Sequence, residues 1–407
     1  MFIPVIILIL VFLLIAIRQV GGYTFRIWQI MLAGAVAVLL LGQITPQAAL
    51  SAIDADVMLF LFGMFVIGGA VQESGYLSSI SHRVFVRAKN PDQFLFLLIL
   101  VMGIFSAILM NDTIAVIGTP LVIALACAWG IDRKGALLAL CFAITIGSVV
   151  TPIGNPQNFL IASFADLGDA FTPFLVYLGI PTFINLIIAW LIVRTFYPPA
   201  SGCPPPVQPE PIRDTSLARL TALSLAIILV LIGFRIVGGI VGYNPLPLMV
   251  IALAGAAPLL LMSPRRGELI RNVDWYTLIF FAALFVLMQS VFDTGFFQSV
   301  IDIQTVTSVP VIMVVSVVIS QFISNVPFVA LFQPLIIQQG MSIQAMLALA
   351  AGSTIAGNLT ILGAASNVIV IQNAERCGVT LTFLEFFKIG LPLTVLNVIV
   401  YTVFLSF

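Results

Sequence analysis

The sequence predicts an all-α protein that crosses a lipid bilayer many times, and three observations support this fold class. Of the 407 residues, 61% are hydrophobic and only 8% are charged, and the mean hydropathy is +1.20. A soluble domain carries roughly 25% charged residues, so this chain is too apolar to face water on all sides. Apolar runs of about 18 or more residues recur along the chain, long enough to span a bilayer as helices. The strict apolar–polar alternation typical of a membrane β-barrel is absent.

The clearest apolar runs follow one another from end to end of the chain. The first lacks the basic start and the small-residue cleavage site of a signal peptide, so we interpret it as a retained helix. The runs lie at residues 2–17, 27–42, 57–72, 93–110, 172–193, 217–234, 245–262, 276–292 and 384–407.

One strongly hydrophilic segment, YPPASGCPPPVQPEPIRDTS at residues 197–216, divides the chain nearly in half. Its prolines forbid helix and favour an extended linker. The two flanking halves share four sequence blocks in the same order, which indicates an internal repeat. The matched blocks are 53–76 with 273–296, 110–123 with 323–337, 151–161 with 360–370, and Gly179 and Pro181 with Gly390 and Pro392.

The basic residues indicate that the two repeats are inverted. With the N-terminus outside and a re-entrant hairpin at 93–128, nearly all Lys and Arg residues fall on the inner side and only Arg235 lies outside. The charge rule supports this orientation but does not test the hairpin itself. Inverted repeats are typical of secondary transporters, which bind their cargo near the bilayer midplane between the repeats.

We therefore predict two inverted repeats, 1–196 and 217–407, joined by the cytoplasmic linker 197–216. Each repeat contains a first group of helices, to which the family resemblance given below assigns a scaffold role, then a re-entrant hairpin, a broken transmembrane helix and a final helix. In the first repeat these are about 1–90, 93–128, 135–164 and 172–194, and in the second they are about 217–300, 309–339, 343–374 and 384–407.

Two glycine- and asparagine-containing stretches predict where the helices break. TPIGNPQN (151–158) and GNLTILGAASN (357–367) each interrupt an apolar segment. Irregular backbone at membrane depth is tolerated only where it is buried in protein or lines a water-filled cavity. The N-termini of half-helices suit an anion, and unwound carbonyls suit a small cation. The breaks therefore predict an ion-binding site made largely of backbone groups.

We predict that each site combines one hairpin tip with one helix break. Asn, Ser and Thr in membrane helices often only bond neighbouring helices, but the same residue types at matched places in both halves favour a functional interpretation. The first site comprises Asn111, Asp112, Thr113, Thr151, Gly154, Asn155 and Asn158, and the second comprises Ser324, Asn325, Asn358, Thr360, Gly363, Ser366 and Asn367. Candidate Na⁺ positions are Asn111, Asp112 and Asn155 in the first site, and Asn325 and Asn367 in the second.

Asp112 breaks the symmetry of the repeat, because its counterpart is Val326. An ionisable residue inside a membrane is costly and is a functional candidate by default. We predict that it exchanges a proton or holds a sodium ion. Neither predicted site contains Lys or Arg, which favours a weakly charged or neutral oxy-species, or a cation, over an unaccompanied citrate.

The motifs TPIGNPQN and GNLTILGAASNVIVI, with MNDT and SNVP at the hairpin tips, resemble the ion transporter superfamily. They are most similar to its branch of arsenical pumps, sodium–proton antiporters and the melanosomal P-protein, which has a citrate-transporter-like domain. The resemblance implies a scaffold, an elevator-type transport domain and a homodimer. Asn155 stands where the P-protein type has an acidic residue, which weakens a sodium-antiporter assignment. The resemblance transfers the family's site regions to Asn111, Asp112, Thr113, Thr151, Asn155, Asn158, Asn325, Thr360, Ser366 and Asn367.

These features lead to the hypothesis of a secondary active transporter for a small inorganic oxyanion or metalloid such as arsenite or antimonite, coupled to H⁺ or Na⁺ through Asp112. The alternatives are a Na⁺/H⁺ antiporter, a Na⁺-coupled di- or tricarboxylate symporter and, as another class, a channel. An intramembrane enzyme is disfavoured, because the chain has no HExxH motif and its lone His82 cannot serve a buried triad.

The expected surroundings follow from the same hypothesis. We expect no cofactor and no nucleic-acid partner. The expected partners are the ion, the lipid bilayer, a second copy of the chain and, for an arsenical pump, an ATPase subunit. We expect a prokaryotic plasma (inner) membrane protein with its N-terminus outside and residues 197–216 in the cytoplasm.

Overall fold

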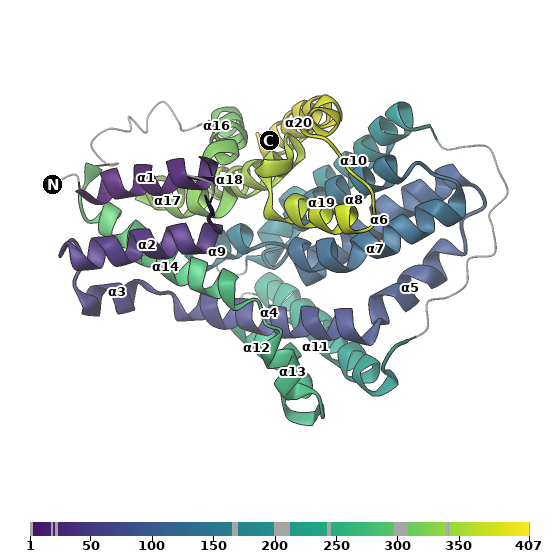
Figure 1. Cartoon of the computed structure of the whole chain (residues 1–407), viewed down its shortest axis with the longest axis horizontal. Coiled ribbons are helices and arrows are strands. Elements are labelled where there is room, and N and C mark those ends of the chain that lie inside the picture. The colour runs from purple at the N-terminus through teal and green to yellow at the C-terminus, as the bar shows by residue number, and fades with distance from the viewer. Residues whose placement is uncertain are drawn as a thin grey trace.

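The computed structural model describes residues 3–17, 19–20, 23–164, 170–198, 212–241, 246–296, 308–338, 340 and 342–406. In this part of the chain nearly every element is a helix, apart from an antiparallel ribbon of Gln19–Val20 (β1) and Tyr23–Thr24 (β2). Eight helices are long and apolar enough to cross a membrane. The predicted all-α membrane fold class is therefore confirmed (Figure 1). Of the predicted linker, residues 199–211 lie outside the described residues.

In the first half, the described residues form ten α-helices and one short 3-10 helix. They are α1 Ile3–Ile17, α2 Ile27–Leu40, α3 Pro46–Ala52, α4 Ala55–Ser74, α5 Tyr76–Phe85, α6 Pro91–Leu109, α7 Asn111–Trp129, α8 Arg133–Gly147, η1 Ser148–Val150, α9 Pro156–Phe164 and α10 Phe171–Phe196.

The described elements of the second half follow the same order as those of the first, and the position that matches α5 falls between α14 and α16. Its elements are α11 Thr215–Val241, α12 Leu248–Met262, α13 Arg266–Arg271, α14 Trp275–Phe292, α16 Val309–Ile323, α17 Asn325–Gln338, α18 Ile343–Ile355, η3 Ala356–Asn358, η4 Ile361–Gly363, α19 Ala365–Arg376 and α20 Phe383–Leu405. In Figure 1, α7 and α17 approach the middle of the molecule from opposite ends of its long axis.

Matched aspartates begin matched helices in the two halves. Asp54 accepts a hydrogen bond from the Val57 N–H (3.0 Å) at the start of α4, and Asp274 accepts one from the Thr277 N–H (3.1 Å) at the start of α14. A side-chain cap of this kind stabilises a helix by about 0.5–2 kcal/mol, because it satisfies an N–H that has no partner inside the helix. The matched aspartates of the two halves therefore play the same structural role, because each caps the helix that follows it.

Each helical hairpin turns at a single residue with an unusual backbone. Met110 joins α6 to α7 with φ 62° and ψ 137°, and Ser324 joins α16 to α17 with φ 69° and ψ 159°. Among the described residues, these two are the only non-glycine residues with positive φ. Such a conformation costs of order 1–3 kcal/mol and persists only where surrounding packing enforces it. The two tips are thus built alike and under similar strain.

Two hydrophobic cores hold the described helices. The larger core joins α4 and the two hairpins to α8, α9, α10, α11, α12, α18, α19 and α20, and to the face of α14 that carries Leu278, Phe281 and Phe285. A separate smaller core joins α1, α2 and α3 to one face of α14. We call these four helices the α1–α3/α14 unit. The hairpin helix α17 contacts this unit through partly buried residues such as Val326 and Leu331, so the two cores meet at a hairpin.

A buried row of amides links the second helix break to α10 and α20. Asn358 donates to the side-chain oxygen of Asn397 (2.9 Å), and Asn397 donates to that of Asn185 (2.9 Å). The hydroxyls of Thr182 and Tyr401 lie 2.8 Å apart on the same pair of helices. Because buried amides without partners are costly, this row fixes the register of α20 against α10 and the break.

A charged cluster at one end of the molecule joins the ends of several helices. The guanidinium of Arg265 lies 2.9 Å from a Glu73 oxygen, 3.6 Å from an Asp214 oxygen and 2.8 Å from a Glu268 oxygen. Hydrogen bonding to Arg265 lowers the pKa of Glu268. Backbone hydrogen bonding from Leu217 first, and then Arg265, lowers the pKa of Asp214.

Replacing Arg265 with glutamine is expected to cause a small, pH-dependent loss of thermal stability. A carboxylate whose pKa is lowered by folding stabilises the protein above its unfolded-state pKa, and this stability is lost as the pH falls through the folded-state pKa. The difference in melting temperature between wild type and Arg265→Gln should therefore be present at pH 7 and shrink below about pH 4. Melting curves in detergent at both pH values test this. A difference that does not change with pH would mean that packing, not charge, is the contribution of Arg265.

Candidate functional site

A polar cavity of about 640 Å³ lies where the two hairpin tips meet α2, α9, α14 and α19. Both carboxylates that line it, Asp112 and Asp274, come from the starts of helices. Its other polar side chains are Arg26, Trp28, Asn111, Gln157, Tyr276, Thr277, Ser324, Asn325 and Gln372. The cavity therefore collects groups from both halves of the chain.

Helix N-termini converge on this cavity. The first residues of α7, α9, α17 and α19 line it, and so do residues that start α2 and α14. The first N–H groups of a helix have no partner inside it, and the helix dipole adds roughly +0.5 charge at that end. Although Asp274 already caps α14, the other N-termini leave the cavity wall with a positive partial charge that suits an anion.

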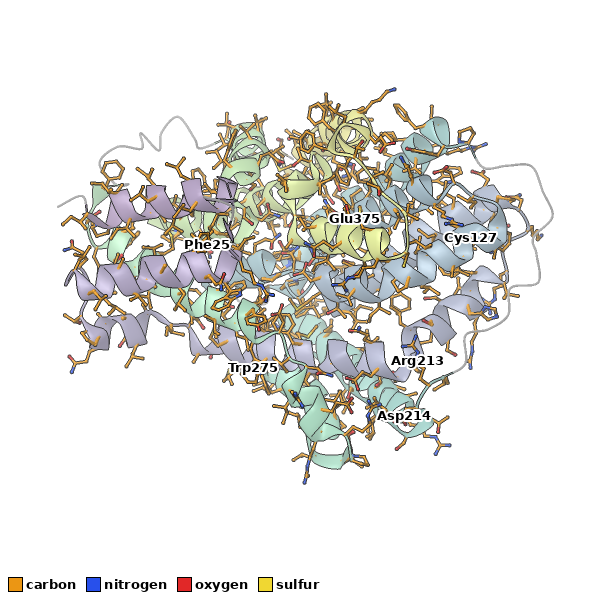
Figure 2. The ribbon with its side chains drawn as sticks, viewed as in Figure 1. Phe25, Cys127, Arg213, Asp214, Trp275 and Glu375 are labelled. Atoms are coloured by element: carbon orange, nitrogen blue, oxygen red, sulfur yellow. The ribbon has the colours of Figure 1, made fainter. Side chains whose placement is uncertain are left out.

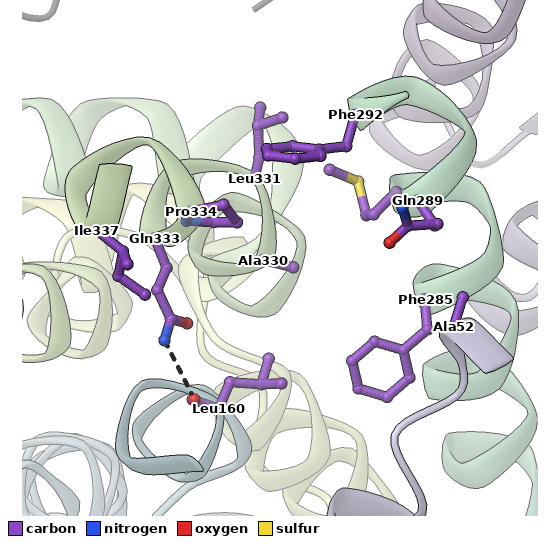
Figure 3. Close-up of a pocket in the computed structure, with 11 residues that line it drawn as sticks. Ala52, Leu160, Phe285, Gln289, Phe292, Ala330, Leu331, Gln333, Pro334 and Ile337 are labelled. Atoms are coloured by element: carbon purple, nitrogen blue, oxygen red, sulfur yellow. Dashed lines mark hydrogen bonds between the residues drawn. The ribbon is translucent and has the colours of Figure 1, made fainter. Parts of the chain in front are cut away.

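A second cavity, of about 350 Å³, is lined mainly by apolar side chains of α14 and α17 (Figure 3). Its two polar side chains are already engaged. Gln289 donates to Asp293 (2.7 Å), and Gln333 donates to the carbonyl of Leu160 (3.3 Å). This cavity therefore has fewer polar groups available to bind an ion than the polar cavity has.

The first helix break is held by its own side chains. Asn155 donates to the Ser148 hydroxyl (3.1 Å) and to the Thr354 hydroxyl (3.2 Å). Asn158 donates to the carbonyls of Ser148 (3.0 Å) and Thr151 (3.1 Å). Both asparagines are fully buried and do not line the polar cavity. They satisfy the unwound backbone of the break and so fix its shape.

The first hairpin tip is bonded to the first break, as the predicted site requires. The Asn111 N–H donates to the Gly154 carbonyl (3.0 Å), and the Thr151 hydroxyl donates to the Ala107 carbonyl. Gly154 has no room for a side chain, because a Cβ there would lie 2.3 Å from the Ser148 carbonyl oxygen. Half-buried Asp112 faces the cavity from this tip. Thr113 instead packs against Gly68 of α4.

The second break repeats this backbone with different bonds. Thr360 has φ −139° and ψ 160°, close to the −134° and 151° of Thr151. Gln321 of α16 connects hairpin and break, because it donates to the Ala356 carbonyl (2.8 Å) and accepts from the Thr360 hydroxyl (2.7 Å). A Cβ at Gly363 would lie 2.5 Å from the same Ala356 carbonyl oxygen, so this position has no room for a side chain.

Buried oxygens without hydrogen-bond partners gather around the second break. At the first break, by contrast, the amides of Asn155 and Gln157 donate to the Thr354 hydroxyl. The positions of the second break that match Asn155 and Gln157 hold Ala364 and Ser366, which have no side-chain amide. An unsatisfied buried polar group costs about 1–3 kcal/mol, whereas an oxygen-rich site without N–H donors suits a small cation. Among the described residues these atoms are Thr145 Oγ1, Asn325 Oδ1, Asn358 Oδ1, Ser366 Oγ and Asn367 Oδ1.

Apart from Thr113, which packs against α4, the predicted site residues fall into two groups. Asn111, Asp112, Ser324 and Asn325 line the polar cavity. The predicted residues of the two breaks are packed behind it, next to the cavity-lining Gln157 and Ala365. They are Thr151, Gly154, Asn155, Asn158, Asn358, Thr360, Gly363, Ser366 and Asn367.

The cavity contains a basic residue that neither predicted site includes. Arg26 lines the polar cavity together with Asp112 and Asn325. The sequence signal for it was helix length: α1 and α2 contain 15 and 14 residues, fewer than the roughly 20 that span a bilayer. Arg26 directly precedes α2, and the packing of α2 against α14 brings it to the cavity.

Comparisons with known proteins agree on the class of this chain. A protein-family model described as citrate transporter matches residues 6–345. An uncharacterised transporter of Mycobacterium tuberculosis is 30% identical over 402 residues, with 92% of both chains covered. The mouse P protein is 24% identical over 483 residues, covering 93% of this chain and 58% of that protein. The crystal structure of the Alcanivorax borkumensis YdaH transporter is similar in fold, with a TM-score of 0.59 at 16% identity over 99% of this chain and 96% of that one.

Proposed function

Because this chain belongs to the citrate transporter family of the ion transporter superfamily and is a secondary transporter of that kind, we propose that it moves a small inorganic oxyanion or metalloid species, such as arsenite or antimonite, coupled to H⁺ or Na⁺. The observation that supports this best is the convergence of helix N-termini and Asp112 on one polar cavity. The N-termini attract an oxygen-bearing anion, and the carboxylate supplies a group whose charge depends on a proton.

Asp112 gives the coupling a definite sign. An anion in the cavity and an ionised Asp112 repel each other by ~3 kcal/mol if they lie ~6 Å apart at an effective dielectric constant of ~20. A proton on Asp112 removes this repulsion, so an anion and a proton bind together. A cation would instead compete with the proton for the carboxylate. Movement of the anion with protons therefore supports the proposal, and exchange of Na⁺ for H⁺ supports the antiporter alternative.

The proposed movement is of the elevator type. The α1–α3/α14 unit has a hydrophobic core on one face of α14, whereas the hairpins and breaks belong to the larger core, which the other face of α14 also contacts. The polar cavity lies between residues of both. We propose that the hairpins and breaks move as one body past this unit, carrying the cargo between the two sides of a prokaryotic plasma membrane. Assembly as a homodimer, an N-terminus outside and a cytoplasmic linker belong to the same proposal.

The decisive experiment is uptake into proteoliposomes. Arsenite, antimonite, phosphate, citrate and labelled Na⁺ are compared with and without an imposed pH or Na⁺ gradient. We expect accumulation of an inorganic species that depends on a gradient and saturates with concentration. Movement of Na⁺ and H⁺ alone would replace the proposal by an antiporter, Na⁺-driven citrate uptake would replace it by a carboxylate symporter, and single-channel currents would replace it by a channel.

The unpartnered oxygens of the second break favour Na⁺ as the coupling ion in addition to a proton. Thr145→Val removes one such oxygen and keeps the shape, so we expect unchanged or higher thermal stability and roughly tenfold weaker Na⁺ dependence of uptake. The matched control is Thr354→Val, which removes an acceptor used by Asn155 and should lower stability by about 1–3 kcal/mol. Equal losses of stability in both variants, with unchanged Na⁺ dependence, would argue against a cation at Thr145.

A further inference from the structure

Arg26 lines the polar cavity, and no carboxylate of the described residues forms an ion pair with its guanidinium. It precedes the first residue of α2, and its backbone N–H is bonded to the side chain of Gln29 (3.0 Å). Its guanidinium carbon lies 5.3 Å from the centre of the Tyr276 ring. Among the described residues no carboxylate lies within ion-pair distance of it, whereas Arg194, Arg265 and Lys134 all have such partners.

Two aromatic rings fix where this guanidinium lies. Tyr276 stacks on Trp28 with 5.1 Å between ring centres and an interplanar angle of 19°, and both rings line the cavity. A guanidinium on an aromatic face is attracted by the ring and keeps its N–H edge free for other partners. In Figure 2 the neighbouring Phe25 lies away from both ends of the long axis. The side chain of Arg26, which is exposed, is therefore held on the Tyr276 ring with its N–H groups available to a ligand in the cavity.

We propose that Arg26 contacts the cargo directly and restricts it to species with at least one formal negative charge. This inference rests on the proposed function and makes it more specific: it favours a charged oxyanion over neutral arsenous acid. A guanidinium offers a planar pair of N–H donors that matches two oxygens of an oxyanion. The helix N-termini add dipoles, but only Arg26 adds a full positive charge among the described residues that line the cavity.

The position of Arg26 also makes its contact dependent on the conformational state. Arg26 belongs to the α1–α3/α14 unit, while Asn111 and Asn325 lie at the hairpin tips. If the hairpins move past this unit and the cargo moves with their tips, the cargo loses its contact with Arg26. Arg26 thus favours anion binding in the state described here and releases the anion in the other.

The test compares Arg26→Gln with the wild type in proteoliposomes, with arsenite, arsenate, phosphate, sulfate and citrate as probes at pH 7. For whichever charged probe the wild type transports, Arg26→Gln should raise KM by about 10- to 100-fold, the effect of losing a charge-assisted hydrogen-bond pair. Any transport of neutral arsenous acid should be unchanged. The matched control is Arg194→Gln, because Arg194 lies 5.2 Å from the Trp190 ring centre but pairs with Asp92 and lies outside the cavity.

The possible outcomes separate this inference from the proposed function. An unchanged KM in folded Arg26→Gln overturns the inference and leaves the transporter standing. A shifted pH profile with an unchanged anion KM would make Arg26 a counter-charge for Asp112 and Asp274, which also overturns it. A wild type that carries no anion at all overturns the proposed function itself. If Arg26→Gln does not fold, Arg26→Lys decides, because it keeps the charge without the planar fork and should raise KM by a smaller factor.

Discussion

Asp112→Asn is expected to abolish accumulation driven by a pH gradient while cargo exchange across the membrane continues. Asparagine has nearly the shape of a protonated aspartate and cannot ionise. The cargo therefore still binds, but the proton no longer changes its affinity. A coupling of ~3 kcal/mol corresponds to a roughly 100-fold effect, and this is the loss of gradient-driven accumulation that we expect. Uptake with a pH gradient and counterflow without one measure the two activities separately.

Two further variants sharpen this result. Asp293→Asn is the matched control, because Asp293 accepts from Gln289 and does not line the polar cavity. The double variant Asp112→Asn with Val326→Asp moves the carboxylate to the other hairpin tip, which lines the same cavity, and should restore part of the pH dependence. Intact coupling in Asp112→Asn would mean that another group, such as Asp274, exchanges the proton.

Gly390→Ala is expected to disable the protein, whereas Gly179→Ala, its counterpart in the first half, is expected to be tolerated. A Cβ at Gly390 would lie 2.1 Å from the Asn358 carbonyl oxygen, so α20 or the second break has to move. At Gly179 the nearest side-chain atoms lie at 3.7 and 3.9 Å, an ordinary contact. Overpacking typically costs 1–3 kcal/mol, while alanine gains about 1 kcal/mol over glycine inside a helix.

Melting temperature and uptake measured on both glycine variants test this pair. Gly390→Ala should lower the melting temperature and reduce uptake at least tenfold, because the shifted break also disturbs the Asn358–Asn397 hydrogen bond. Gly179→Ala should melt at or above the wild-type temperature. Similar behaviour of the two variants would show that α20 does not approach the break as closely as described.

The sequence was sufficient to predict the helical membrane fold and the positions of the irregular backbone. The breaks at Thr151 and Thr360 were predictable because glycine and asparagine, joined by proline in the first break only, interrupt an apolar run, and such interruptions have few structural outcomes in a membrane. The strained tips at Met110 and Ser324 were not predictable in this detail. Positive φ in these residues results from the packing of whole hairpins, not from local preference.

Of the predicted site residues, Asn111, Asp112, Ser324 and Asn325 line the polar cavity, whereas the bonds that the asparagines of the breaks make were not predictable. Asn155 and Asn158 were predicted as ion ligands, but in the structure Asn155 donates to the Ser148 and Thr354 hydroxyls and Asn158 donates to backbone carbonyls of the break. A sequence shows that an amide is present and not which of two partners it bonds. Arg26 was missed because its distance from Asp112 and Asn325 in the sequence conceals a cavity that only the tertiary fold assembles.

The shortness of α1 and α2 has an electrical consequence. Helices of 15 and 14 residues are about 21–22 Å long, whereas the hydrocarbon layer is about 30 Å thick. Beside them the bilayer has to thin or water has to enter. The transmembrane voltage then falls over a shorter insulating distance, and the charged side chains at the start of α2 and at the hairpin tips experience a correspondingly steeper field.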